Sequence, residues 1–136
     1  MRATLIIALF VLMSTAGCTG RTGPIAAVRE DVETFTLPVG KSIEWKVRMS
    51  AGGQLEYSWT ADQPLPFDFH SDHDDGTNNF VSHKESTLAA DGGAFTAPFD
   101  GRHGWYWRNK ALQSVGITLK IKGAYEVVGR TGGTAP

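Results

Sequence analysis

The stretch FDFHSDHDDGTNN, residues 67–79, concentrates the side chains that most readily bind metals or exchange protons. Carboxylates and imidazoles suit divalent zinc, copper, manganese or calcium. Asp68 and His70 are two apart on an expected strand, so both point to one side of it. An EF-hand loop beginning at Asp72 is excluded, because Gly76 occupies the fifth position, where a ligand is needed. The candidate metal ligands are Asp68, His70, Asp72, His73 and Asp74.

The same stretch has a second interpretation, as a solvated loop between strands that its charges keep soluble. Loops on a rigid β scaffold often carry recognition. We therefore expect a partner-binding loop here and keep a divalent-metal site as the alternative. The candidate contact residues are Asp72, Asp74, Asp75, Asn78 and Asn79.

Other chemistry-bearing residues are isolated in the sequence. We expect His103 in a turn, bonded to the backbone, and His83 facing solvent from a strand, with no nucleophile for either to activate. Neither a Gly-x-Ser-x-Gly elbow nor a phosphate-binding loop is found, and no pair of carboxylates is supported as a catalytic site. The sequence predicts a protein that is not an enzyme and needs no cofactor.

The N-terminus has the pattern of an export signal. Arg2 precedes the apolar run ATLIIALFVLM, which is too short to span a bilayer. The following STAGC resembles the lipobox of bacterial lipoproteins, which implies that residues 1–17 are a signal helix and that Cys18 carries the lipid. An ordinary signal peptide with an incidental cysteine is the alternative. Thr19 stands where that family's inner-membrane retention signal has Asp, so the resemblance implies the periplasmic face of the outer membrane.

Composition limits the rest of the chain to one domain. We expect a tether at 18–33, a folded domain at 34–128 and a disordered tail at 129–136. The 136 residues include 13 basic and 14 acidic side chains, a balance that argues against nucleic acid as a partner. Cys18 is the only cysteine, so the fold has no disulfide.

The folded part has the two-residue period of β-strands. Apolar residues alternate with polar ones in SIEWKVRM, QLEYSWTA, PFDFH and SVGITLKIK. The first two segments, separated by AGG, predict a hairpin. Short strands separated by Gly, Pro, Asp and Asn predict an all-β fold, an antiparallel β-sandwich of about seven or eight strands.

The aromatic segment GWYWRN raises the question of core or platform. Trp105 and Trp107 share one face of a strand, and Tyr106 lies on the other. We expect the two indoles in the core, with an exposed platform for sugar or peptide as the alternative.

The segment GGAFTAPFDGRHGWYWRN, followed by SVGITLKIKG, resembles the C-terminal half of the GOLD domain of p24 cargo receptors. The matching positions are Gly93, Phe95, Gly101, Trp105, Trp107 and Asn109. The folded part is also similar to small bacterial envelope proteins of uncharacterised role. Tyr106 stands where p24 proteins have a cysteine, so their disulfide does not carry over. The resemblance implies a GOLD-like or jelly-roll-like sandwich that binds proteins, here a lipid-anchored module with an envelope protein as partner.

Overall fold

The computed structural model describes residues 27–77 and 79–131, and all its regular structure is β. The strands are β1 (Val28–Leu37), β2 (Ser42–Met49), β3 (Gln54–His73), β4 (Phe80–Thr96), β5 (Gly101–Arg108), β6 (Val115–Ala124) and β7 (Glu126–Thr131). No helix of the described residues is long and apolar enough to cross a membrane. The predicted signal helix and Cys18 lie outside the described residues.

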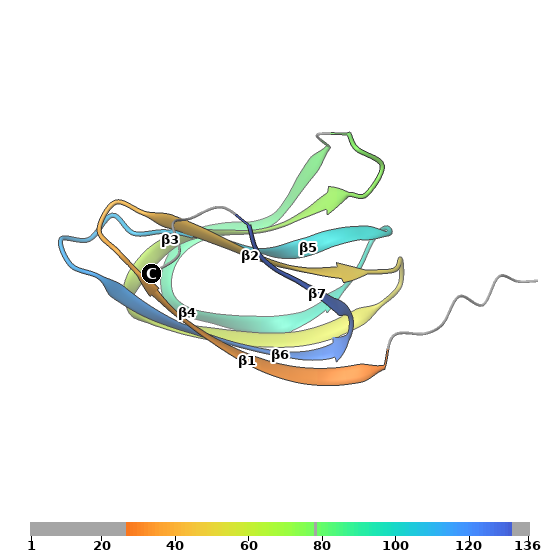
Figure 1. Cartoon of the computed structure of the whole chain (residues 1–136), viewed down its shortest axis with the longest axis horizontal. Coiled ribbons are helices and arrows are strands. Elements are labelled where there is room, and N and C mark those ends of the chain that lie inside the picture. The colour runs from red at the N-terminus through yellow and green to blue at the C-terminus, as the bar shows by residue number, and fades with distance from the viewer. Residues whose placement is uncertain (1–26, 78, 132–136) are drawn as a thin grey trace, which may run out of the picture.

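The seven strands form one antiparallel sheet that curls until its two halves face each other (Figure 1). One half pairs β1 with β6, β6 with the start of β3, and β3 with the end of β4. The other half pairs β7 with β2, β2 with β5, and β5 with the end of β3. Because β3 and β4 run through both halves, they join the layers. The predicted antiparallel all-β fold is confirmed.

β3 corrects one expected boundary, because QLEYSWTA and PFDFH, expected as separate strands, belong to one strand of 20 residues. The β3–β4 register shifts between Thr60 and Leu65, around Pro64. Proline has no N–H to donate to a ladder, so it interrupts pairing and permits a bend. The bend carries the chain from one layer to the other. Because it interrupts the alternation of apolar and polar residues, the sequence pattern indicated two strands.

The predicted hairpin of SIEWKVRM with QLEYSWTA is wrong. β2 pairs with β5 and β7, whereas β3 pairs with β4, β5 and β6. The link between β2 and β3 turns at Gly52, whose φ of 79° lies in the left-handed region. Gly52 and Gly53 then bond to Ala97 rather than closing a β2–β3 ladder. The sequence indicates the turn, but which strands it joins in the sheet depends on pairing between segments distant in sequence.

The core between the layers confirms the predicted faces of the strands. Trp105 and Trp107 are fully buried, whereas Tyr106 between them is partly exposed on the other face. Trp59 packs edge-on against Trp107 with ring centroids 5.7 Å apart. The core alternative for GWYWRN is therefore the one that the structure supports. The aliphatic positions of SIEWKVRM and SVGITLKIK complete the core (Ile43, Val47, Met49, Val115, Ile117, Leu119 and Ile121).

The ends of the sheet differ from the expected limits of the domain. β1 begins at Val28, inside the expected tether, and β7 extends to Thr131, inside the expected tail. Val28 and Val32 face outward, while Asp31 on the opposite parity accepts a hydrogen bond from Tyr125 at 2.8 Å. This inverted pattern hides the strand from a search for apolar alternation.

Candidate functional site

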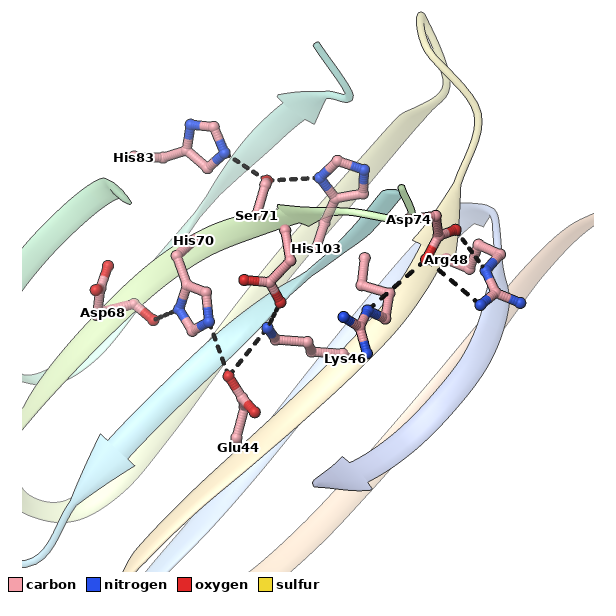
Figure 2. A network of polar contacts seen from close by, with 11 residues as sticks. Glu44, Lys46, Arg48, Asp68, His70, Ser71, Asp74, His83 and His103 are labelled. Carbon is pink, nitrogen blue, oxygen red and sulfur yellow. Dashed lines mark hydrogen bonds and ion pairs between the residues drawn. The ribbon is translucent and has the colours of Figure 1, made fainter. Parts of the chain in front are cut away.

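The Asp/His-rich stretch begins within β3 and not in a loop. Alternation along a strand sends successive side chains to opposite faces of the sheet. Asp68, His70 and Asp72 therefore lie on the outer face, and Ser71 lies on the inner face with Phe69. The two faces make two separate polar clusters (Figure 2).

The outer cluster borders a hollow of about 570 Å³ on the outer face of β2, β5 and β3. We call this hollow the outer trough. Thr77, from the connection between β3 and β4, and Phe80, the first residue of β4, line one side of it. Its lining mixes acidic, basic and aromatic side chains: Glu44, Lys46, Asp68, His70, Asp72, Thr77, Phe80, Arg102 and Tyr106.

Gly104 explains how Lys46 reaches the middle of the trough. Gly104 pairs with Lys46 on β2 and with His70 on β3. A Cβ at this position would collide with the carbonyl oxygen of Trp45 and lie 2.8 Å from Cγ of Lys46. Only glycine therefore lets β2 approach closely while the lysine side chain lies beside β5.

Lys46 is 4% exposed, and its ammonium is held by two carboxylates. Nζ lies 3.0 Å from Glu44 Oε1 and donates to Asp72. The same Oε1 of Glu44 is 2.8 Å from Nε2 of His70, and Nδ1 of His70 is 3.3 Å from the carbonyl oxygen of Asp68. Both ring nitrogens of His70 therefore lie within hydrogen-bond distance of an oxygen atom.

Beyond His73 the described residues of the β3–β4 hairpin tip, 74–77 and 79, lie next to the sheet, and Asp74 contacts it. Asp74 accepts a hydrogen bond from Nε of Arg48 at 2.8 Å, and its other oxygen lies 3.7 Å from Nε of Arg102. Asp75 accepts hydrogen bonds from the backbone N–H and the hydroxyl of Thr77 at 2.9 and 2.6 Å. These bonds lower the pKa of Asp75 and fix the turn.

Each of the five candidate metal ligands contacts a different residue. Asp68 accepts from Ser82 at 2.7 Å, and the ring of His73 stacks on that of Phe99 with centroids 3.6 Å apart. His70, Asp72 and Asp74 contact Glu44, Lys46 and Arg48 respectively. Within residues 27–77 and 79–131, no three His, Cys, Asp or Glu side chains are grouped so that they could hold a metal ion.

The candidate partner-binding residues lie partly in the tip and partly in the strand. Asp74, Asp75 and Asn79 belong to the tip, and Asp72 is the outward residue of β3 that contacts Lys46. Asn78 lies outside the described residues. The sequence prediction did not include the neighbouring contribution of β2 and β5, which comes from residues 44–48 and 102–106.

The inner cluster places Ser71 between two imidazoles. Its Oγ is 2.6 Å from Nε2 of His83 on β4 and 2.6 Å from Nδ1 of His103 on β5. His103 lies within β5 and is fully buried, which corrects its expected place in a turn. His83 is exposed overall, but its Nε2 turns toward Ser71. One sequence signal could have revealed this cluster. Ser71 is two residues from Phe69, and His103 is two residues from Trp105, so each lies on the same inner face of its strand as that aromatic residue.

Burial keeps both histidines of the inner cluster neutral. Desolvation lowers the pKa of His103 to about 4 and also lowers that of His83. One hydroxyl hydrogen can serve only one imidazole, so Ser71 donates to one ring and accepts from the other. Nε2 of His103 is buried and has no hydrogen-bond partner among the described residues.

A serine beside a histidine is the arrangement that activates a nucleophile, so its surroundings decide what this pair can do. Ser71 is fully buried, and so is His103. Phe95 and Phe99 lie beside His103, with ring centroids at 5.3 and 5.6 Å. A hydroxyl without exposed surface offers no approach for a substrate in this conformation, and the cluster fits a structural bond between three strands.

The comparisons with known proteins leave the function to be argued from these two clusters. No protein-family model matches the chain, and a search of curated proteins finds no significant similarity. The resemblance to GOLD domains and to lipoproteins therefore stays a prediction from the sequence.

Proposed function

We propose that this chain is a lipid-anchored binding module of the cell envelope, acting without catalysis. Its binding surface would be the outer trough together with the described part of the hairpin tip, residues 74–77 and 79. The lipid anchor at Cys18 and a position on the periplasmic face of the outer membrane rest on the N-terminal sequence alone.

The observation that carries this proposal is the burial of charge on the outer face. Lys46 is only 4% exposed, although it does not belong to the apolar core. Burying charged groups costs free energy even when they are paired, and apolar residues would often stabilise such a position better. A network retained at that cost beside an open trough supports recognition of a polar partner.

The preorganised geometry supports the same role. The Asp75 turn and the contacts of Asp74 hold the hairpin tip against β2 and β5. A binding surface that is already ordered loses less conformational entropy when a partner arrives. Figure 1 shows that this end of the β3–β4 hairpin projects from the body of the sheet, where a partner can reach it.

In-cell photo-crosslinking tests the proposal. A photoreactive residue at Tyr106 or Thr77, which line the trough, should capture one specific envelope protein. The same residue at Lys120, exposed on the other half of the sheet, is the matched control. The Cys18→Ser variant should move to the soluble periplasmic fraction and lose most of the capture, because stable anchoring needs the acyl chains. Equal capture at all three positions, or none, would contradict the proposed surface.

A further inference from the structure

Two arginines stand side by side at the end of the outer trough. Arg48 of β2 and Arg102 of β5 are direct register partners, so both side chains extend from the same face. Their guanidinium groups converge on the carboxylate of Asp74 in the hairpin tip (Figure 2 shows its contact with Arg48). Two like charges in adjacent positions repel each other unless an anion lies between them.

Asp74 satisfies this pair incompletely. It accepts a hydrogen bond from Arg48 Nε at 2.8 Å, while its contact with Arg48 Nη2 is 3.5 Å. Its distance to Nε of Arg102 is 3.7 Å, too long for a hydrogen bond. That Nε is nevertheless buried, and no residue of the described chain accepts its hydrogen. An unsatisfied buried donor is unfavourable, and an acceptor placed about 2.9 Å away would remove that cost.

We infer that Arg48 and Arg102 form a carboxylate-binding site for an acidic segment of the protein partner, and that Asp74 is its internal occupant. This inference rests on the proposed function and names the chemistry of the partner. The side chains of Arg48, Arg102 and Asp74 are 53, 41 and 33% exposed. Ion pairs this exposed contribute little to stability, so a competing carboxylate can displace Asp74 at small cost.

The neighbouring charges favour a carboxylate over a phosphate. Asp72 is the register partner of Arg102 on β3, and Glu44 lies farther along the trough. A phosphate would concentrate two negative charges at one point beside Asp72, whereas each carboxylate of a peptide carries one charge and matches the fork of one guanidinium. Beyond the arginines the trough presents Tyr106 and Phe80, which suit the rest of an extended polypeptide.

An NMR titration of the purified protein tests this inference. The Nε–Hε resonances of the arginines are followed while hexaglutamate peptide is added at low ionic strength, where screening is weak. The resonances of Arg48 and Arg102 should shift to saturation. Asp74→Asn should tighten binding about two- to fivefold, because it removes the internal competitor. Arg102→Gln should weaken binding about tenfold or more, because it removes a charged hydrogen-bond donor.

The matched control is Asp31→Asn, which removes a carboxylate that pairs with Arg29 on β1, away from the trough. It should leave the affinity for hexaglutamate unchanged. If Arg102→Gln does not fold, Arg102→Lys keeps the charge and should still weaken binding, because the planar fork is lost.

Three results would overturn the inference. The first is an absence of saturable shifts at Arg48 and Arg102, and the second is an unchanged affinity in Asp74→Asn. The third is an equal response to inorganic phosphate or to phosphatidylglycerol vesicles, which would indicate a general anion site. Crosslinking that still captures a partner at Tyr106 after any of these results would leave the proposed function standing.

Discussion

His70 and Ser71 are neighbours in β3, yet they lie on opposite faces of the sheet in different electrostatic surroundings. His70 faces the outer trough, where Glu44 and Lys46 bring opposite charges together. Ser71 faces inward, where it joins two imidazoles whose pKa values burial lowers. A one-residue step along a strand thus separates an ionic network from a neutral one.

The difference shows which face suits recognition. On the outer face, charged side chains border an open trough, where a partner can exchange contacts with them. On the inner face a charge would be costly, so hydrogen bonds between neutral groups hold β3, β4 and β5 together. The outer network is therefore the better candidate for binding, and the inner cluster is the better candidate for holding the hairpin in place.

Substitutions at neighbouring positions of β5 should show the largest difference between the faces. Trp107→Ala removes a fully buried indole that packs against Trp59 and Phe35, so it should lower the free energy of unfolding by about 3–5 kcal/mol. Tyr106→Ala, on the outer face, should cost clearly less. Urea denaturation measures both values. If the two substitutions cost the same, the faces are not distinguished by packing.

Acid should weaken the inner cluster selectively. The unfolded chain binds protons to histidine near pH 6.5, whereas His103 in the folded chain does so near pH 4. The unfolded state therefore binds more protons between these values, and stability present above pH 6.5 is lost as pH falls. The loss from His103 should be about 1.4 kcal/mol for each pH unit, or about 3 kcal/mol by pH 4.

Urea denaturation from pH 7 to pH 4.5 measures this loss, with His103→Phe as the comparison. The variant lacks the titrating ring, so its stability should depend less steeply on pH. Carboxylates that titrate near pH 4 are common to both proteins and cancel in the difference. Parallel pH dependences would show that His103 is not the group responsible.

The strand faces were predictable because they follow a local period of two. Every apolar residue of SIEWKVRM lies inside, as the alternation indicated. The sequence could not indicate that β2 pairs with β5 instead of β3, because strand partners depend on contacts distant in sequence. It placed His83 on a strand but did not indicate the full length of β4, whose exposed residues show no clear alternation.

The candidate site was predictable only in part, for the same reason. The acidic residues of β3 and the hairpin tip are adjacent in sequence and could be identified together. Lys46, Arg48 and Arg102 come from other strands and meet them only after pairing. Ser71 carried no local sign of function, since its partners His83 and His103 are 12 and 32 residues away.

Two serines of the hairpin provide the finest test of the difference between the faces. Ser71→Ala removes the hydroxyl that hydrogen-bonds Nδ1 of the buried His103, so it should cost about 1–3 kcal/mol in urea denaturation. Ser82→Ala also deletes a hydroxyl, but that hydroxyl donates to Asp68 on the exposed face, and water can replace it. Its cost should be within about 0.5 kcal/mol.

Ser71→Thr, which keeps the hydroxyl, should lose less stability than Ser71→Ala if the hydrogen bonds rather than the size of the side chain matter. A Ser71→Ala protein as stable as the wild type would mean that the two imidazoles do not depend on this hydroxyl, and that β3, β4 and β5 are held by the aromatic core alone.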